Sequence, residues 1–246
     1  GRPEPDLMQW LDIVALGTVC DVVPLTGLNR ALVAQGLRVM ARRANPGLSA
    51  LADVGGVREL PEAYHLGFVM GPRVNAGGRV GESLLGTRLL STPDTAEAAE
   101  IAGLLDGYNR ERQEIEAAVL VEAIEQVEGA PGAEDSPLVL AAGEGWHPGV
   151  IGIVAGRLKE RYNRPACVVS LEGDVGKGSG RSVTGLDLGT AVLAARQEGL
   201  LVNGGGHKMA AGFTVARDRL DDFRAFLETR LREQLGGGPL VPELML

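Results

Sequence analysis

Residues 136–171 read SPLVLAAGEGWHPGVIGIVAGRLKERYNRPACVVSL. Two short apolar runs in this stretch, Leu138–Ala142 and Ala166–Leu171, are typical of buried strands. Between them, Val150–Tyr162 carries apolar residues at helical spacing. A strand, a helix and a second strand in that order predict an α/β domain.

The same alternation continues toward the C-terminus. The pattern predicts a strand near Gly178–Val183, a helix over Leu188–Gln197, a strand over Gly212–Val215 and a helix over Leu220–Leu235. Gly236–Pro239 is predicted to be a linker, and Leu240–Leu246 to begin a strand whose partners are absent. We therefore expect one α/β domain over residues 136–235.

A long acidic helix is predicted to precede this domain. Thr92 is a capping hydroxyl and Pro93 suits the first helical position, and the helical pattern runs on to Glu128. Between Asp94 and Asp135 there are twelve acidic residues and two arginines. Residues 93–135 are thus expected to be a helical connector, although such a segment is also typical of an ordinary solvated helix.

The N-terminal part predicts a second α/β lobe. Leu11–Val19 is an apolar run with β-branched residues, typical of a strand buried on both faces. Asn29–Arg43 has helical spacing, Gly67–Gly81 is expected to be a glycine-rich loop region, and Leu84–Leu90 a short helix. The expected fold class is α/β, with two α/β lobes joined by a long helical connector.

Composition excludes some classes of protein. With 246 residues and 45% hydrophobic residues the chain can bury proper cores, and no apolar run approaches the ~20 residues of a membrane span. The net charge of −8 means that nucleic-acid binding needs a local basic patch, and Ser136–Arg217 carries nine basic against six acidic residues. Two cysteines indicate reduced thiols in the cytoplasm, and the start Gly1-Arg2-Pro3-Glu4 indicates a cut.

Two motifs in the first half suit phosphoester chemistry. Asp21 follows the predicted strand over Leu11–Val19, where open α/β sheets place ligand groups, so it is a candidate metal ligand. A carboxylate that caps the following turn is the more common alternative. The glycine-rich motif GPRVNAGGR offers Arg73, Asn75 and Arg79 to a phosphate. The alternative is a structural loop whose arginines pair with nearby acids such as Glu82.

Three motifs in the second half suit an oxyanion. GSGRS at 178–182 brings a hydroxyl, a guanidinium and backbone N–H groups together, though a plain β-turn has the same sequence. NGGGHKMAAG at 203–212 holds His207 and Lys208 on three glycines, which favours ligand contact over a purely structural role. GEGWHPG at 143–149 leads into a helix N-terminus, where Trp146 either stacks on a base or, more commonly, lies in the core.

Six motifs occur in the order in which RecJ exonucleases carry them. They are LGTVCDVVPL (16–25), GPRVNAGGR (71–79), YNRERQEIE (108–116), GEGWHPGVIGIVA (143–155), GSGRS (178–182) and GGGHKMAAG (204–212). From about residue 11 to residue 233 the chain therefore resembles the RecJ-type exonucleases of the DHH phosphoesterase family. By that resemblance residues 1–92 are the C-terminal portion of the DHH domain, 93–135 the connector, 136–235 the DHH-associated domain, and 236–246 a linker toward a following domain.

The resemblance implies a function. RecJ-type enzymes degrade single-stranded DNA from the 5′ end in repair and recombination, using two divalent metals, Mn²⁺ or Mg²⁺. Asp21 matches the last aspartate of the family's metal site and is the implied catalytic and metal-binding residue. The implied DNA- and phosphate-binding residues are Arg73, Asn75, Arg79, His147, Ser179, Arg181, Ser182, Gly205, Gly206, His207 and Lys208. The implied partners are single-stranded DNA through its 5′ end, with single-strand-binding protein or a helicase as a candidate protein partner.

The sequence departs from the family in its metal ligands. It contains no Asp-x-Asp after a strand and no Asp-His-His, and its histidines, His65, His147 and His207, are isolated from one another. One carboxylate cannot hold a two-metal centre, so the chain alone is expected to lack hydrolytic activity.

Two other functions stay open. One is a DHH-family phosphodiesterase for short oligonucleotides or cyclic dinucleotides, which a chain-length preference assay on the intact protein separates from a RecJ-type exonuclease. The other is a non-catalytic module that binds nucleic-acid ends or a partner protein, which fits the missing ligands and the uneven charge.

Overall fold

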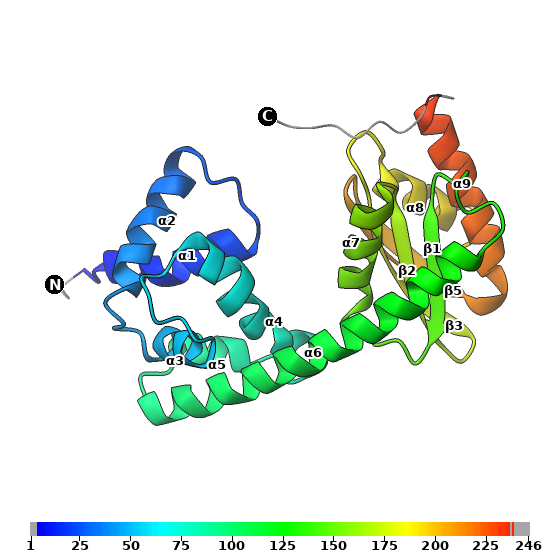
Figure 1. Ribbon diagram of the computed structural model, residues 1–246. Coiled ribbons are helices and arrows are strands. Elements are labelled where there is room, and N and C mark those ends of the chain that lie inside the picture. The colour runs from blue at the N-terminus through cyan, green and yellow to red at the C-terminus, as the bar shows by residue number, and fades with distance from the viewer. Residues whose placement is uncertain (1–3, 237, 239–246) are drawn as a thin grey trace. The chain divides into compact units, whose positions relative to one another are not determined.

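A computed structural model describes residues 4–236 and 238 of the chain (Figure 1). The chain divides into two compact units, Gly1–Arg112 and Gln113–Leu246. Helix α6 (Thr95–Gly129) belongs to the first unit over its first half and to the second unit over the rest. The predicted linker and final strand at 236–246 lie outside the described residues, except for Gly236 and Gly238.

Among the described residues of the first unit, helices are the only regular secondary structure, so the α/β lobe expected for the N-terminal part is wrong. Before α6 they are η1 (Leu7–Trp10), α1 (Leu11–Cys20), α2 (Gly27–Met40), α3 (Pro46–Val54), the π-helix η2 (His65–Met70), α4 (Gly71–Val80) and α5 (Leu85–Ser91). The helices expected over 29–43 and 84–90 are present as α2 and α5. Helix α3 was not expected, although Asn45 is a typical cap whose side chain accepts a hydrogen bond from the Leu48 N–H at 3.0 Å.

The strand predicted over Leu11–Val19 is wrong, because this segment is helix α1. Its buried residues include Leu11, Ala15 and Leu16, which share one side of a helix. A nearly continuous apolar run has too few polar positions to reveal its period. Since the described residues of this unit offer no strand to pair with, the helix satisfies the backbone of the segment internally.

The loop expected over Gly67–Gly81 is also wrong, because η2 and α4 cover this region. Several of its glycines allow close packing. A Cβ at Gly71 would collide with Sγ of Cys20 on α1, and a Cβ at Gly77 would lie 2.7 Å from the carbonyl oxygen of Glu82. Helix propensity alone disfavours glycine, but these contacts leave no room for a side chain.

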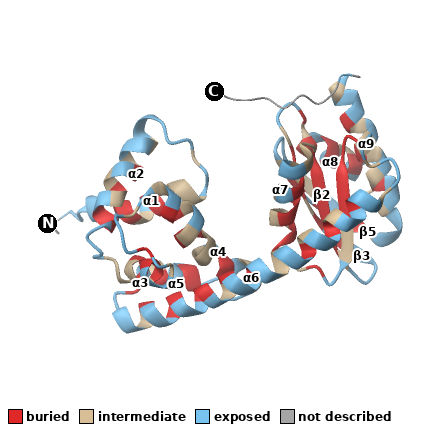
Figure 2. Cartoon of the chain, viewed as in Figure 1, coloured by how far each residue is buried: buried red, intermediate tan, exposed pale blue. Residues whose placement is uncertain are grey.

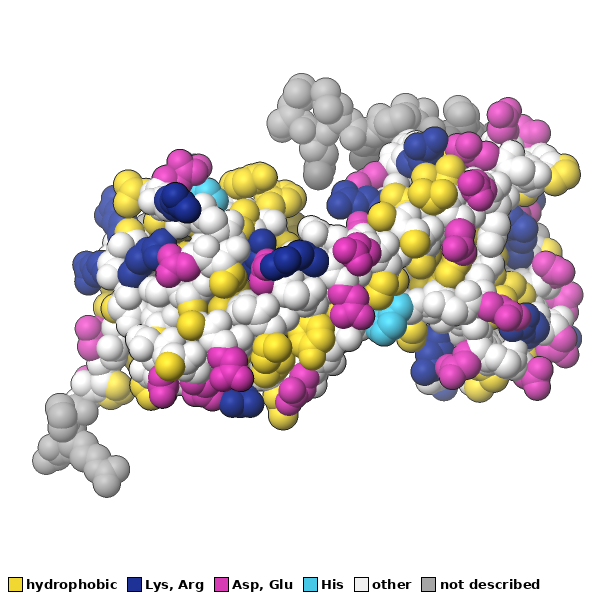
Figure 3. Space-filling model, turned by 60° about the horizontal axis from the view of Figure 1, so that its bottom comes forward, with side chains coloured by type: hydrophobic (Ala, Val, Ile, Leu, Met, Phe, Trp, Pro, Cys, Tyr) yellow, Lys and Arg dark blue, Asp and Glu magenta, His cyan; other side chains and the backbone are white. Residues whose placement is uncertain are grey.

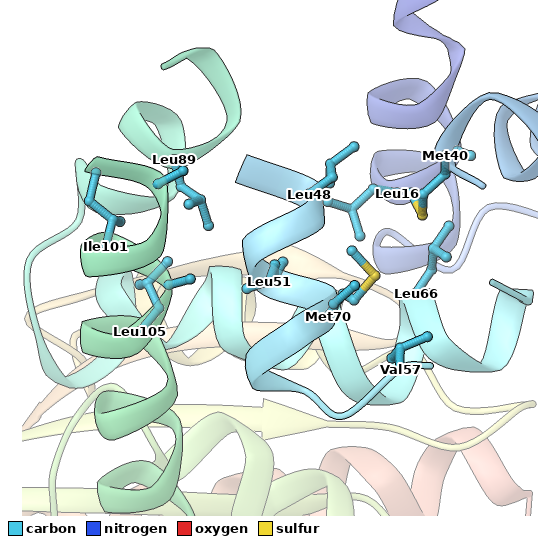
Figure 4. Close-up of a cluster of buried hydrophobic side chains, with 14 of the residues drawn as sticks. Leu16, Met40, Leu48, Leu51, Val57, Leu66, Met70, Leu89, Ile101 and Leu105 are labelled. Carbon is cyan, nitrogen blue, oxygen red and sulfur yellow. The ribbon is translucent and has the colours of Figure 1, made fainter. Parts of the chain in front are cut away.

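The core of the first unit joins α1, α3, η2 and the first half of α6 (Figure 4). Leu16, Leu51, Met70 and Leu105 come from these four elements, and each is at most 3% exposed. The first unit therefore buries its apolar surface without a strand. Packing of helix on helix holds it together.

The second unit is an α/β domain, as the sequence predicts. After the end of α6 it contains β1 (Val139–Glu144), α7 (Ile151–Tyr162), β2 (Ala166–Glu172), β3 (Val175–Arg181), α8 (Leu188–Gln197), β4 (Asn203–His207), β5 (Ala210–Ala216), η3 (Arg217–Arg219) and α9 (Leu220–Leu235). The five strands form one sheet in the order β1-β2-β3-β5-β4. Strands β1 and β2 are parallel and the other neighbours are antiparallel. The three glycines that precede His207 lie in strand β4, which the sequence did not predict.

Helices cover the two faces of this sheet unequally (Figures 1 and 2). Helix α7 lies on one face, where a Cβ at Gly152 would be 3.0 Å from Oγ of Ser179. On the other face, a Cβ at Gly180 would lie 2.6 Å from the Leu188 side chain of α8. Helix α9 also lies on that other face, where Phe223 packs against Phe213 of β5 with ring centroids 4.8 Å apart.

The second half of α6 protects the edge strand β1. The side chain of Gln126 accepts a hydrogen bond from the Ala142 N–H (3.1 Å) and donates one to the Ala142 carbonyl (3.0 Å), much as a neighbouring strand would. Trp146 lies in the core and donates its indole N–H to Glu122 at 2.7 Å.

Among the described residues, no helix is long and apolar enough to cross a membrane.

Glycine packing in α4 makes a first prediction. Gly71→Ala should destabilise the chain by about 1–3 kcal/mol, because its Cβ would overlap Cys20 and lie 2.7 Å from the Leu66 carbonyl oxygen. Gly78→Ala on the same helix has open space at its Cβ and should leave stability unchanged or raise it slightly. Thermal unfolding followed by circular dichroism measures both variants. Equal melting temperatures for the two would show that Gly71 is not required by packing.

Candidate nucleic-acid interface

Strand β3 alternates glycine with polar residues. Gly176, Gly178 and Gly180 are buried, and a Cβ at Gly178 would collide with the Phe213 ring. Because neighbouring residues of a strand point to opposite faces, Lys177, Ser179 and Arg181 share the opposite face, the one on which α7 lies. The chain thus uses glycine for the inward positions of β3 and polar residues for the outward ones.

These polar residues belong to rows that cross three strands. Arg181 pairs in register with Ala210, which pairs with His207. Ser179 pairs with Gly212, which pairs with Gly205. Residues that are directly opposite in antiparallel strands have their side chains on the same face. The predicted residues Ser179, Arg181, Gly205 and His207 therefore lie together on one sheet face.

Arg181 is a half-buried cation on this face. Its Nη1 donates to Oγ of Ser179 (3.1 Å) and to the carbonyl of Gly180 (2.9 Å). Burial lowers the pKa of Arg181, but a guanidinium stays charged at neutral pH. Among the described residues no carboxylate forms an ion pair with it. A partly desolvated cation without a counter-charge favours binding of an anion.

Gly205 and Gly212 form a glycine floor beside Ser179, a stretch of sheet whose backbone no side chain covers. A Cβ at either position would meet no atom within 4 Å, and neither residue has a positive φ. Internal packing therefore does not explain these glycines, and glycine inside a strand costs stability. A ligand that approaches the backbone closely would explain them. Gly212 was not among the predicted residues, because its register with Ser179 is known only from the structure.

The turn between β4 and β5 presents the next predicted residues. His207 and Lys208 are exposed. Nδ1 of His207 accepts a hydrogen bond from the Met209 N–H at 3.3 Å, which orients the ring. The Lys208 carbonyl accepts from the Leu188 N–H at 3.2 Å, so α8 holds the turn in place. Gly206 has no room for a side chain, because its Cβ would lie 2.6 Å from the Ala211 Cα.

Ser182 and His147 are held by local hydrogen bonds. Ser182 is 1% exposed, and its hydroxyl donates to the Leu186 carbonyl at 3.0 Å. Nδ1 of His147 accepts from the Gly149 N–H at 3.1 Å in the turn that precedes α7. The start of α7 lies next to Ser179 and Arg181 through Gly152, so the positive end of the helix dipole adds to the anion-binding character of this face.

In the first unit, Asp21 is not at the end of a strand. It is the exposed residue that ends α1, and its own N–H donates to the Gly17 carbonyl at 3.0 Å. Val22, which follows it, has φ 55° and is 86% exposed. A β-branched residue in the left-handed region is uncommon, so the backbone next to Asp21 is strained.

Arg73 is committed to an ion pair inside the first unit. Its Nε donates to Oδ1 of Asp106 (2.9 Å) and its Nη1 to the Val69 carbonyl (2.7 Å). Burial opposes ionisation of Asp106, but the hydrogen bond from Arg110 and the charge of Arg73 outweigh it and lower the pKa of Asp106. Arg73 thus pairs with a nearby acid, as the structural alternative expects. The acid is Asp106 and not Glu82.

The other two predicted residues of this region lie on α4. Asn75 is exposed and Arg79 is half-buried. Figure 3 shows acidic and basic side chains interspersed over the visible face, with no continuous basic surface. Among the described residues, no group of three or more histidine, cysteine, aspartate or glutamate side chains could hold a metal ion. The residues present therefore do not fit a two-metal centre.

Comparison with known proteins identifies relatives of both units. A DHHA1 domain model matches residues 135–233. The chain is 45% identical to the single-stranded-DNA-specific exonuclease RecJ of Dickeya dadantii, over 91% of this chain and 40% of that protein. Escherichia coli RecJ is 41% identical over 89% of this chain and 39% of its own length. The chain is a homologue of RecJ.

Solved RecJ structures share the fold. The Thermus thermophilus RecJ structure with Mg²⁺ has a TM-score of 0.83 and 36% identity, and covers 93% of this chain and 35% of that one. The structure of the same protein with Mn²⁺ has a TM-score of 0.82, covering 93% and 33%. The chain spans about two fifths of the length of the curated RecJ relatives named above. The resemblance to RecJ that the six motifs indicate is confirmed.

The buried ion pair of the first unit makes a second prediction. Asp106→Asn should destabilise the chain by about 1–3 kcal/mol at neutral pH, because it leaves the Arg73 guanidinium partly buried without its counter-charge. Since the folded pKa of Asp106 is lowered, its contribution is complete above its ordinary pKa of about 4 and is lost as pH falls through the folded value. The difference between wild type and variant should therefore shrink below about pH 4.

Urea unfolding at a series of pH values measures this difference. Glu111→Gln is the control, because Glu111 is exposed on the same helix. A stability difference for Asp106→Asn that is the same at every pH would contradict the proposed ionisation.

Proposed function

We propose that this chain is the strand-binding part of a RecJ-type exonuclease that degrades single-stranded DNA from the 5′ end. The observation that carries the proposal is Arg181, a half-buried cation that lacks an ion pair among the described residues and lies on a face floored by glycine. Homology to RecJ supplies the substrate class. The same proposal assigns the enzyme to DNA repair and recombination in the cytoplasm. Its proposed protein partner is single-strand-binding protein or a helicase.

In this proposal the terminal 5′ phosphate lies against β3. The Arg181 guanidinium offers N–H donors in a planar fork that suits phosphate oxygens. The Ser179 hydroxyl lies within hydrogen-bonding distance of that guanidinium, and the glycine floor lets the sugar–phosphate backbone approach the sheet. His207 and Lys208 border the same face from the β4–β5 turn.

The proposed domain boundaries rest on the resemblance to RecJ. Residues 1–92 are proposed to end the DHH domain, 93–135 to connect, 136–235 to form the DHH-associated domain, and 236–246 to lead onward. The DHHA1 match over 135–233 supports the third of these. Asp21 is the proposed metal ligand, and the remaining ligands for Mn²⁺ or Mg²⁺ have to come from outside the described residues.

A second candidate function is a non-catalytic module that binds nucleic-acid ends. The specific observation in its favour is that the described residues contain no metal-binding cluster. Supplying a RecJ polypeptide that carries Asp-x-Asp and Asp-His-His in trans discriminates the two: metal-dependent cleavage that requires both polypeptides supports the exonuclease.

Arg181 is the basis of a third prediction. Arg181→Ala should weaken binding of 5′-phosphorylated single strands by about 1–3 kcal/mol, the range for a hydrogen bond to a charged group, and should change binding of 5′-hydroxyl strands less. Fluorescence anisotropy with matched oligonucleotides measures both. Arg230→Ala is the control, since Arg230 pairs with Glu233 on α9 and lies away from this face. Equal losses for both kinds of end would show that Arg181 does not recognise the terminal phosphate.

Hydrolysis provides a fourth prediction. The 246-residue chain should not cleave DNA with Mn²⁺ or Mg²⁺, because Asp21 alone cannot hold two metals. Weak binding of single strands should survive and should weaken steeply as salt is raised. Labelled single-stranded DNA with Mn²⁺, beside Asp21→Ala to detect contaminating nuclease, tests this. Metal-dependent degradation from the 5′ end that disappears in Asp21→Ala would show that the chain does contain a working site.

A further inference from the structure

Helix α7 covers part of the sheet face on which it lies. It contacts β1, β2 and β3, whereas Asn203 of β4 and Gly212 of β5 are exposed. An open concavity of about 500 Å³ is lined by residues of β3, β5 and β4. Three of the lining side chains form one row, since Lys177 pairs in register with Thr214, which pairs with Asn203. This part of the sheet therefore offers a polar surface to a ligand.

The lining of this concavity favours an anion. Lys177 is exposed, and among the described residues no carboxylate forms an ion pair with it. Oδ1 of Asn203 accepts a hydrogen bond from the Gly204 N–H at 2.9 Å, which leaves its NH2 group to donate to a ligand. None of the described lining residues is acidic, in a chain with a net charge of −8. A cation, an amide and the Thr214 hydroxyl suit phosphate oxygens.

The same lining does not suit a nucleobase. Bases of single strands bind proteins chiefly by stacking on aromatic side chains. Among the described lining residues the aromatic one is Phe213, which is 5% exposed and packs its ring against Phe223. Glycines supply much of the floor. The concavity thus offers charge and hydrogen bonds but no aromatic surface on which a base could stack.

The concavity adjoins the position proposed for the terminal phosphate. Nη1 of Arg181 lies 3.1 Å from Oγ of Ser179, so the guanidinium reaches over the row of Ser179, which is one row from Lys177. Adjacent rows are about 7 Å apart along a strand, and the flexible lysine stem can shorten that gap. Gly205 and Gly212 continue the row of Ser179 and also line the concavity. A ligand on this row can therefore extend toward Lys177 over open backbone.

A 5′-triphosphate has the shape to span these two rows. It continues from the α-phosphate through two bridging oxygens, in the direction away from the sugar. Its γ-phosphate can therefore approach Lys177 while its α-phosphate stays at Arg181. The first linkage of the strand leaves from the 3′ side of the same sugar. That linkage thus remains available to metal ligands from outside the described residues.

We propose that the concavity binds the β- and γ-phosphates of a single strand that carries a 5′-triphosphate, through Lys177, Thr214 and Asn203. This inference rests on the proposed function, because the α-phosphate takes the position proposed for the terminal phosphate at Arg181. It extends the substrate class of the site from 5′-monophosphorylated to 5′-triphosphorylated single strands.

Binding of matched oligothymidylates tests the proposal. Three strands of one sequence carry a 5′ hydroxyl, a 5′-monophosphate or a 5′-triphosphate, and a fourth is 5′-adenylylated, with AMP joined to its 5′ phosphate. Anisotropy at low salt without divalent metal measures their affinity for the 246-residue chain. The triphosphate should bind about tenfold more tightly than the monophosphate, through one exposed ion pair and hydrogen bonds to a charged group. The adenylylated strand should gain less, because a nucleoside replaces the γ-phosphate.

The variants locate the contact. Lys177→Ala should remove most of the triphosphate gain and keep the gain of the monophosphate over the hydroxyl, and Lys177→Gln, which keeps much of the stem, should do the same. Thr214→Val should reduce the triphosphate gain without changing the charge of the protein. Arg181→Ala should remove the monophosphate gain. Lys159→Ala is the control, because Lys159 lies on α7 outside the lining of the concavity, and should leave the triphosphate gain unchanged. Melting temperatures equal to that of the wild type show that the variants fold.

The remaining outcomes are decisive as well. Equal wild-type affinity for triphosphate and monophosphate would overturn the inference, as would a triphosphate gain that Lys177→Ala preserves or that Lys159→Ala lowers equally. The proposed function stands in these cases if Arg181→Ala still removes the monophosphate gain. An adenylylated strand that gains as much as the triphosphate would show that the concavity takes a nucleoside, which also overturns the inference. Equal wild-type affinity for monophosphate and hydroxyl ends, unchanged in Arg181→Ala, would overturn the proposed function together with the inference.

Discussion

The alternation of residues along β3 is the constraint on which the candidate interface depends. Gly176, Gly178 and Gly180 point inward, where the side chains of Val169, Phe213 and Leu188 respectively leave no room for a side chain. A slip of one residue in the pairing would turn the polar residues into the core and the glycines outward. Pairing with β2 on one side and β5 on the other holds the register. The packing of the core and the polar character of the face that carries Ser179 and Arg181 thus both follow from the two-residue period of β3.

Two arginines show how surroundings decide the role of a residue type. Arg73 has an acidic partner, Asp106, whose pKa is lowered by Arg110 and Arg73 together, and its Nε and Nη1 both donate inside the first unit. Arg181 is also removed in part from water, but the described residues give it a hydroxyl and a carbonyl and no counter-charge. Both motifs contain arginine among glycines, and only the contacts distinguish a structural cation from one that favours an anion.

Strand binding and hydrolysis are separable in physical terms. A guanidinium or ammonium attracts a phosphate without a metal, while in-line hydrolysis by two metals needs several oxygen or nitrogen ligands close together. The described residues provide the first kind of group on one sheet face and no cluster of the second kind. The chain is related to RecJ over about two fifths of the length of the curated relatives.

The sequence by itself determined the α/β alternation of the second unit, including the bounds of α8 and α9, because their apolar spacing and flanking glycines agree with the tertiary packing. It also determined the RecJ resemblance and most of the residues on the candidate face. It did not determine α1 or the helices over 65–80, where a uniform apolar run and close-packed glycines carry no clear period. Only the tertiary structure decided which arginine has a buried carboxylate partner and which residues share a row, because ion pairing and strand register join residues that are far apart in the chain.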